Sequence, residues 1–210
     1  MFPKIDLLLK ELLNNFDSIS YERKLVLKKL GNYINAKIDI DEEINLVYIC
    51  THNSRRSHFG QIAAAIAADF YGIKNIKCYS GGTQITTFNH IAIRALQNLG
   101  CIINTTNIES NNPVYEVAYS ASKFEICYSK LYNDPTNPKL NFAAIITCSD
   151  AEQNCPLING ADCIIGTTYK DPKEADNTPL ANQTYKNRFK QIATETLYAF
   201  SLINNQKNNS

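Results

Sequence analysis

The chain has 210 residues, enough to bury the core of one domain together with a small additional segment. Its 21 lysines and arginines nearly balance 20 aspartates and glutamates, and the net charge is +1. This composition argues against a nucleic-acid partner, so binding of an anion would depend on a local site. No apolar run approaches the roughly 20 residues that a membrane-spanning helix requires, and we expect no membrane association.

Seven cysteines are present, an odd number that leaves at least one thiol without a partner in the chain. The first residues, from Met1 to Asp6, lack the shape of a signal peptide. We therefore expect a cytoplasmic protein with reduced thiols. No C-x2-C pair and no G-x4-G-K-[ST] sequence occurs, so the sequence predicts no metal site and no cofactor.

Residues 1–44 form a segment of their own, for which we predict two helices. The first carries apolar residues at helical spacing, namely Ile5, Leu8, Leu9, Leu12, Leu13 and Phe16. The second runs from Tyr21 to Ile34, with Ser18 or Ser20 as its N-cap. This N-terminal extension is expected to pack on the main domain and cover apolar surface. A role as a lid or a partner surface is the alternative.

A strand, a loop and a helix are predicted next. Leu46 to Ile49 is a short apolar run typical of a buried strand, and the alanine-rich run from Gln61 to Phe70 is typical of a helix. Cys50 begins the loop between them. The amides of such a loop and the helix N-terminus point at a common centre, which predicts an anion site.

The residues of this loop suit the chemistry of a nucleophilic thiolate. A cysteine near a helix N-terminus and a guanidinium is expected to be ionised at neutral pH. Arg56 offers a planar fork of donors for two oxygens of a tetrahedral oxyanion. Ser57 can donate a hydrogen bond to the sulfur, and Asn53 tolerates the left-handed backbone that a tight loop needs.

Further strands and helices alternate along the rest of the chain. Strands are predicted at 76–80, 142–147 and 164–168, and helices at 89–99 and 184–203. This order predicts an α/β fold with a four-stranded parallel sheet flanked by helices.

An insertion at 107–141 interrupts this alternation, and we predict a β-hairpin between Val114 and Tyr132. Its aromatic residues either wall the anion site or pack on the sheet. The carboxyl ends of parallel strands share one edge, so Cys50, Ser80 and the two residues Cys148 and Asp171 are expected to face one crevice.

Four motifs carry a resemblance to a known family. Cys50-x5-Arg56-Ser57, Ser80-Gly-Gly-Thr83, Cys148 to Pro156 and Asp171-Pro172 resemble segments of the low-molecular-weight protein tyrosine phosphatases and their relatives, the thioredoxin-coupled arsenate reductases. The resemblance spans residues 45–203 and implies a phosphatase-like domain at 45–210. It also implies that the residues between Cys50 and Arg56 bind the oxyanion, namely Thr51, His52, Asn53, Ser54 and Arg55.

The resemblance implies a nucleophilic role for Cys50 and a general-acid role for Asp171. Cys148 and Cys155 match the pair that relays a disulfide in the arsenate reductases, and on this basis arsenate reduction coupled to a thioredoxin-like reductant is the preferred prediction. Hydrolysis of phosphotyrosine or aryl phosphate is the alternative, and a non-catalytic phosphopeptide binder is a third. Lys173 departs from the Asp-Pro-Tyr of the phosphatases. Whether His52 contacts the substrate is left open.

Overall fold

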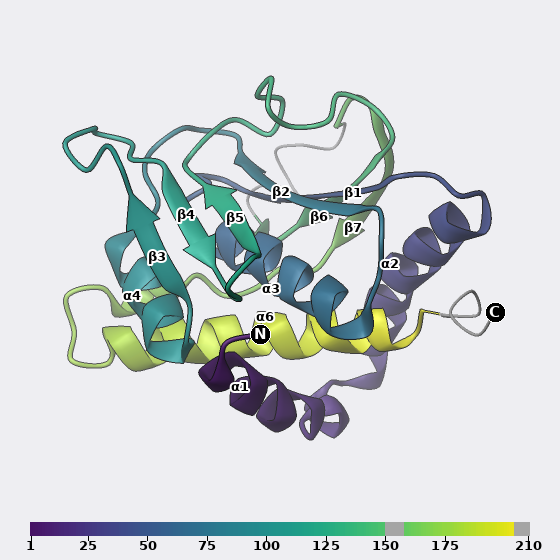
Figure 1. Ribbon diagram of the computed structural model, residues 1–210, viewed down its shortest axis with the longest axis horizontal. Helices are drawn as coiled ribbons and strands as arrows, with labels where there is room; N and C mark the ends of the chain where they lie inside the picture. The colour runs from purple at the N-terminus through teal and green to yellow at the C-terminus, as the bar shows by residue number, and fades with distance from the viewer. Residues whose placement is uncertain (150–157, 204–210) are drawn as a thin grey trace.

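A four-stranded parallel sheet lies at the centre of the computed structural model, which describes residues 1–149 and 158–203 (Figure 1). Its order is β2-β1-β6-β7. The strands are β1 (Ile44–Cys50), β2 (Ile76–Gly82), β6 (Phe142–Ile146) and β7 (Ala161–Gly166). The predicted α/β fold is therefore confirmed, although β7 begins three residues earlier than the predicted strand at 164.

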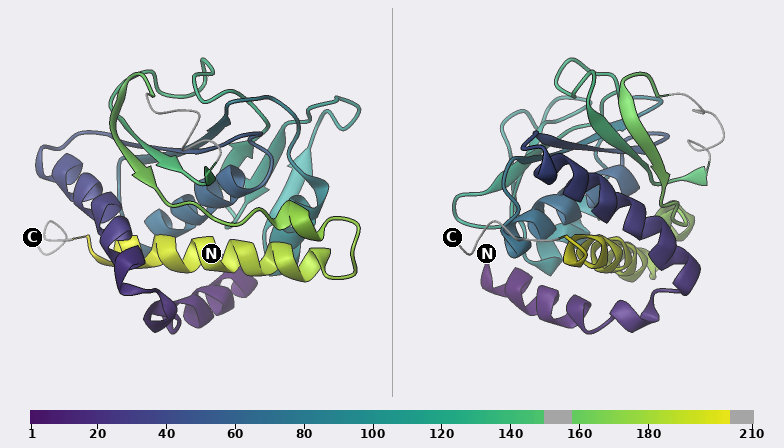
Figure 2. Two further views of the ribbon diagram at one scale, coloured as in Figure 1. Left: turned by 180° about the vertical axis from the view of Figure 1, so that it is seen from behind. Right: turned by 90° about the vertical axis from the view of Figure 1, so that its right-hand side faces the viewer.

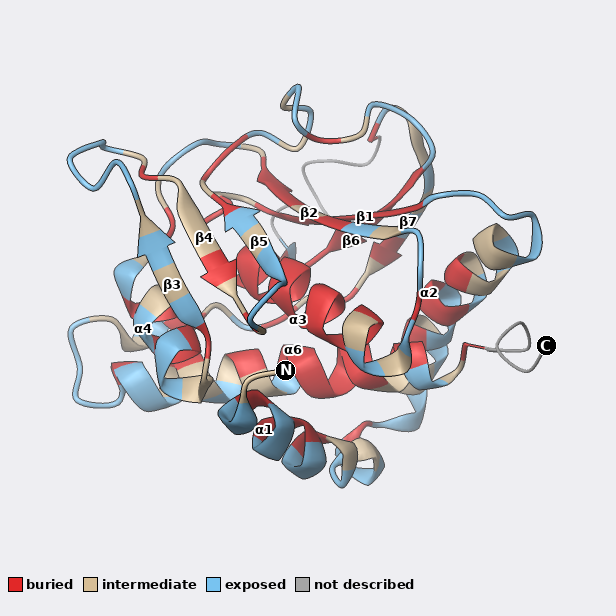
Figure 3. Ribbon diagram, viewed as in Figure 1, coloured by how far each residue is buried: buried red, intermediate tan, exposed pale blue. Residues whose placement is uncertain are grey.

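Both faces of the sheet are covered, because all seven residues of β1 are buried. Alternate side chains of a strand point to opposite faces. Leu46 and Tyr48 join the larger core, and Val47 and Ile49 join a smaller cluster on the other face. Helices α3 (Arg56–Tyr71) and α6 (Ala181–Ser201) pack beneath the first face (Figures 1 and 3).

Helix α3 begins at Arg56, five residues before the predicted helix at 61. An apolar sequence pattern does not predict this first turn of the helix, because Arg56, Ser57 and His58 are polar. All three are nevertheless buried. Gly60 brings the helix close to the sheet, since a Cβ atom there would lie 2.2 Å from the ring of Tyr48. The N-terminus of α3 is thereby fixed directly after the loop that follows β1.

The predicted hairpin is present as part of a second sheet. Strands β4 (Tyr115–Ala118) and β5 (Phe124–Cys127) pair antiparallel, and β3 (Ile102–Thr105) pairs with β4. The sequence does not predict β3, which is only four residues long. It follows α4 (His90–Leu99), which ends at Gly100 in the left-handed conformation.

The aromatic side chains of the hairpin serve mainly in packing. Tyr115 packs edge-on against Phe88, and Tyr119 is buried in the larger core. Phe124 is exposed and Tyr128 lies beneath the ammonium group of Lys130. The described contacts therefore favour the packing interpretation over an aromatic wall.

The N-terminal segment contains α1 (Pro3–Leu13), η1 (Phe16–Ser18) and α2 (Tyr21–Asp39). Both helices contact α6, and α1 lies on the side of α6 opposite the sheet (Figures 1 and 2). Gly31 allows a close approach, because a Cβ atom there would lie 3.0 Å from the carbonyl oxygen of Ala199. The short helix η2 (Pro172–Ala175) precedes α6. No helix among the described residues has the length and apolar character needed to cross a membrane.

Candidate active site

The loop between β1 and α3 directs its carbonyl groups outward. The oxygens of Thr51, His52 and Ser54 accept hydrogen bonds from the surrounding segments. The donors are the amides of Thr83, Gln84 and Asn89 and the hydroxyls of Thr83, Thr86 and Ser129, at 2.8 to 3.2 Å. Across a trans peptide the next N–H points the opposite way, so the amides of His52, Asn53 and Arg55 face inward. Within the described residues no hydrogen bond from these three amides is found.

Asn53 organises the inside of this loop. It is fully buried and adopts the left-handed conformation, with φ of 44°. Its Oδ1 accepts a hydrogen bond from the backbone N–H of Lys130 at 2.9 Å, which fixes the orientation of the amide. Its Nδ2 therefore donates to Ser57 Oγ, also at 2.9 Å.

Ser57, which Asn53 orients, contacts Cys50 in turn. The two side chains are 3.1 Å apart, measured from Oγ to Sγ. Because Asn53 already donates to the Ser57 oxygen, the hydroxyl hydrogen is available for the sulfur, which acts as the acceptor. A hydrogen bond to the sulfur and the nearby N-terminus of α3 both stabilise a thiolate. Cys50 is 4% exposed and carries a free thiol at the end of β1.

Arg56 connects the loop to the segment that follows β7. Its Nη1 donates to the carbonyl oxygen of Tyr169 at 2.8 Å, and its Nη2 donates to Asp171 Oδ2 at 2.5 Å. The other oxygen of Asp171 caps η2 by accepting the N–H of Lys173 at 3.0 Å. Among the described residues the buried Nε of Arg56 has no hydrogen-bond partner. The carboxyl group of Asp171 and the guanidinium of Arg56 therefore form one unit beside the loop.

The neighbouring Arg55 has a different place. Its Nε donates to the hydroxyl of Tyr185 at 2.6 Å, and its Nη2 donates to Asp176 Oδ2 at 2.9 Å. The Tyr185 hydroxyl donates to Asp176 Oδ1 at 2.6 Å and closes the triangle. The side chain of Arg55 is thus held by α6 and the segment before it. Because this side chain is bound elsewhere, only the inward-facing backbone amide of Arg55 remains for the predicted binding of an oxyanion.

Three predicted residues remain, namely Cys148, Cys155 and Ser80. Cys148 is fully buried, and its Sγ lies 3.4 Å from Thr51 Oγ1 at the edge of the loop. Cys155 lies outside the described residues. Ser80 does not face the crevice, because β2 continues to Gly82 and the Ser80 hydroxyl contacts His58 Nδ1 at 3.1 Å. That prediction is wrong for Ser80.

Two supporting residues carry no motif in the sequence. Tyr169 acts through its carbonyl oxygen, and Lys130 acts on Asn53 through its backbone N–H. Any residue other than proline can supply a backbone N–H, and every residue supplies a carbonyl oxygen. Only the approach of segments distant in the chain makes these two positions specific, and side-chain patterns do not report that approach.

We expect Gly82→Ala to lower the activity of the site strongly. A Cβ atom at Gly82 would lie 2.7 Å from the Thr51 carbonyl oxygen and 2.8 Å from the Asn53 amide nitrogen, so the loop backbone must move. A misplacement of about 1 Å can cost about 100-fold in rate. Steady-state turnover of an aryl phosphate measures this loss.

Gly81→Ala is the matched control for this prediction. It lies on the same strand, and its Cβ would meet the backbone of Tyr132, with 2.3 Å to the Cα atom. Both variants are expected to lose stability, but only Gly82→Ala presses directly on the loop. Equal losses of activity in the two variants at equal melting temperature would contradict the prediction.

We also expect His58 to make the fold sensitive to acid. It is fully buried between Ser80 and Phe88, and burial, with a smaller effect of the Lys130 charge, lowers its pKa to about 3. The unfolded chain binds this proton near pH 6.5, so stability is lost as the pH falls from about 6.5 toward 3. The difference is worth on the order of 5 kcal/mol when complete.

Chemical unfolding at several pH values tests this expectation. His58→Gln should flatten the fall in unfolding free energy below pH 6.5, because the glutamine cannot titrate. His90→Gln is the control, since His90 is exposed on α4 and should leave the fall unchanged. The same pH dependence in both variants would refute a role of His58.

The known proteins that resemble this chain do so in their structures. No protein-family model matches the chain, and no curated protein matches it. The structure is similar to that of a YwlE mutant from Bacillus subtilis, with 12% identity, a TM-score of 0.49, and coverage of 76% of this chain and 97% of that one. It is also similar to a low-molecular-weight phosphotyrosine phosphatase from Vibrio cholerae O395, with 14% identity, a TM-score of 0.48, and coverage of 75% and 94%.

A third similar structure is the YwlE arginine phosphatase from Geobacillus stearothermophilus. It is 12% identical, with a TM-score of 0.44 and coverage of 75% of this chain and 91% of that one. At these identities the similarity concerns the arrangement of the backbone.

Proposed function

We propose that this chain is a cysteine-dependent hydrolase of phosphate monoesters, with aryl phosphates, including phosphotyrosine, as the substrate class. The observation that supports it most directly is the hydrogen-bonded path from Asn53 through Ser57 to the sulfur of Cys50. This path stabilises an anionic nucleophile inside a loop of inward-facing amides. A binding site for an anion alone would not need that nucleophile.

The proposed reaction has two steps. The Cys50 thiolate attacks phosphorus while the loop amides and Arg56 bind the non-bridging oxygens. The bond from phosphorus to the leaving oxygen breaks, and Asp171 gives that oxygen a proton. In the second step Asp171 takes a proton from water, which attacks the phosphocysteine. Phosphate leaves, and the Cys50 thiolate and the protonated Asp171 are restored.

The ion pair between Arg56 and Asp171 suits this sequence of events. A phosphate dianion competes for the guanidinium that Asp171 now occupies at 2.5 Å. It would also give the unpartnered Nε of Arg56 an acceptor, and an unsatisfied buried donor costs about 1–3 kcal/mol. The carboxyl group of Asp171 would then be released from the guanidinium, as its proposed role at the leaving oxygen requires.

Hydrolysis of p-nitrophenyl phosphate, combined with rapid quenching, tests the proposal. We expect turnover together with a covalent phosphoenzyme whose phosphate maps to Cys50. Absence of turnover toward p-nitrophenyl phosphate and phosphotyrosine peptides would refute the proposal.

Reduction of arsenate is the second candidate, and the position of Cys148 beside Thr51 favours it. In this reaction the Cys148 thiolate attacks the sulfur of a Cys50–arsenate adduct, arsenite leaves, and a disulfide forms. Cys155 would take over the disulfide and pass it to a thioredoxin-like reductant, which supplies the two electrons. Both reactions need reduced cysteines, in keeping with the cytoplasmic location expected from the sequence.

The sequence motifs favour the reductase, but we rank hydrolysis first because the hydrogen bonds of Cys50 and Asp171 support their proposed roles as nucleophile and acid. Arsenate-dependent consumption of NADPH, coupled through thioredoxin and its reductase, separates the two. Consumption that is lost in Cys155→Ser, without turnover of aryl phosphate, would reverse the ranking.

A further inference from the structure

The segment that carries Asp171 is tied to the N-terminal extension. Nη2 of Arg23, in the first turn of α2, donates to the carbonyl oxygens of Thr167 at 2.8 Å and Thr168 at 3.4 Å. The N-cap Ser20 accepts the N–H of Arg23 at 3.2 Å, which stabilises this turn. A single guanidinium therefore holds two successive peptides of the segment that follows β7.

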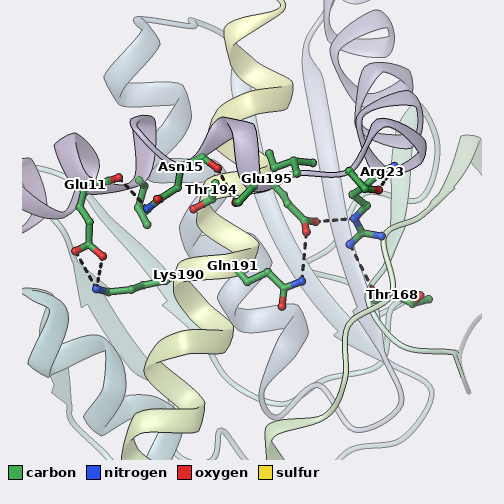
Figure 4. A pocket seen from close by; sticks show the side chains of 12 residues that line it. Glu11, Asn15, Arg23, Thr168, Lys190, Gln191, Thr194 and Glu195 are labelled. Atoms are coloured by element: carbon green, nitrogen blue, oxygen red, sulfur yellow. Dashed lines mark hydrogen bonds and ion pairs between the residues drawn. The ribbon is translucent and has the colours of Figure 1, made fainter.

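The same guanidinium is fixed by α6. Its Nε donates to Glu195 Oε2 at 2.7 Å, and Figure 4 shows Arg23 between Glu195 and Thr168. The hydroxyl of Tyr169 donates to the same carboxylate oxygen at 2.8 Å, and the Arg23 guanidinium lies 4.7 Å from the centre of the Tyr169 ring. Burial and the Glu195 charge raise the pKa of Tyr169, so its hydroxyl remains a donor.

Tyr169 connects this network to the candidate active site. While its hydroxyl is bound to Glu195, its carbonyl oxygen accepts the hydrogen bond from Arg56 Nη1 at 2.8 Å. Two residues later, Asp171 accepts the hydrogen bond from the other nitrogen of Arg56. A path of hydrogen bonds thus runs from α2 along residues 167–171 to Arg56.

We propose that Arg23 is a positioning residue, through which the N-terminal extension sets the place of Asp171 relative to the loop after Cys50. The role assigned to Asp171 rests on the proposed function, but the effect of Arg23 on residues 167–171 does not. The motif-bearing domain thereby depends on the extension for the geometry of its proposed acid. The extension is then more than a cover for apolar surface.

The space around Arg23 allows it to be replaced without overpacking. A cavity of about 500 Å³ lies between the extension and α6, and Arg23, Thr168 and Glu195 line it. Glu195 is only 7% exposed in its side chain, so removal of Arg23 alone would leave a buried charge without its partner. The test variant is therefore Arg23→Met with Glu195→Gln. It carries no uncompensated charge, and the amide oxygen can still accept the Tyr169 hydroxyl.

A matched control lies on the same helix. Lys37 forms an ion pair with Asp162 of β7 at 3.1 Å, and neither residue of this pair lies within 167–171. Lys37→Met with Asp162→Asn removes this pair without a change in net charge. It also removes the contact of Lys37 to Glu42 at 2.7 Å, whose carboxylate is exposed to solvent. The control variant should lose a similar ion pair between α2 and the sheet, without loss of the contacts to Thr167 and Thr168.

Two measurements on the full chain test the proposal. Hydrogen exchange of the peptide that contains residues 167–171 should become about tenfold faster or more in the Arg23/Glu195 variant and stay unchanged in the control. The kcat/KM for phenyl phosphate should fall about 10- to 100-fold, because a poor leaving group needs the acid. The kcat/KM for p-nitrophenyl phosphate, whose leaving group needs little protonation, should fall by less than about 3-fold.

The outcomes separate this proposal from the proposed function. Unchanged exchange at 167–171 in the Arg23/Glu195 variant overturns the proposal, whatever the activity. Faster exchange with an unchanged ratio of the two kcat/KM values overturns the link to Asp171. If the unaltered chain hydrolyses neither ester, the proposed function is wrong, and the exchange measurement alone decides whether Arg23 positions the segment. A similar change in the control variant would also overturn the proposal.

Discussion

Cys50→Ser is expected to lower the kcat/KM for aryl phosphate by about 10⁴-fold or more, because a serine hydroxyl in this loop is a far weaker nucleophile than a thiolate. The serine keeps the size of the side chain and its contact to Ser57, so the loop should remain folded. Steady-state hydrolysis of p-nitrophenyl phosphate and isolation of the phosphoenzyme measure the loss. The covalent intermediate should disappear together with the activity.

Cys163→Ser is the control for the nucleophile. Cys163 lies on β7, and burial, together with the charge of Asp162, raises the pKa of its thiol. A thiol of this kind is a poor nucleophile at neutral pH. Its replacement should leave kcat/KM within about 3-fold of the unaltered chain. Retention of aryl phosphate turnover by Cys50→Ser would contradict both the hydrolase and the reductase.

Phosphate binding by Cys50→Ser separates loss of the nucleophile from loss of the folded loop. In the proposed reaction, the oxyanion binds to the inward amides and to Arg56, which the serine leaves in place. Protection of Cys50→Ser by inorganic phosphate against thermal unfolding should therefore persist. Loss of both activity and phosphate binding would indicate a collapsed loop, and loss of activity alone would identify the sulfur as the reacting atom.

The parts of the fold that the sequence predicts well are those with a local signal. The apolar run before Cys50, the alanine-rich helix after the loop and the strand at 142–147 each show their own composition, and each is present. The left-handed conformation at Asn53 also follows from its own residue type. Such features depend on residues that are neighbours in the chain.

The parts that escaped prediction depend on distant segments. Arg23 and Thr167 are 144 positions apart, and Arg55 and Tyr185 are 130 positions apart. The sequence alone does not distinguish the adjacent residues Arg55 and Arg56, although their side chains bind different partners. Strand β3 is short and depends on its pairing with β4, so composition alone could not indicate it.

The two adjacent arginines allow the second large prediction. Arg56→Lys is expected to lower the kcat/KM for aryl phosphate by about 10²- to 10³-fold, the usual cost of a lost oxyanion donor. Lysine keeps the charge but lacks the planar fork that contacts both the Tyr169 carbonyl oxygen and Asp171. The affinity for inorganic phosphate, measured as competitive inhibition, should weaken in parallel.

Arg55→Lys is the matched control, because it makes the same chemical change one residue earlier. The guanidinium of Arg55 binds Tyr185 and Asp176 and not the groups that Arg56 contacts. The variant should therefore lower the melting temperature, while kcat/KM falls by less than about 10-fold. A large loss of activity in Arg55→Lys with little loss in Arg56→Lys would indicate that Arg55, and not Arg56, binds the oxyanion. That result would contradict the prediction. The pair of variants therefore tests which guanidinium faces the substrate, since the two residues are adjacent and the chemical change is the same.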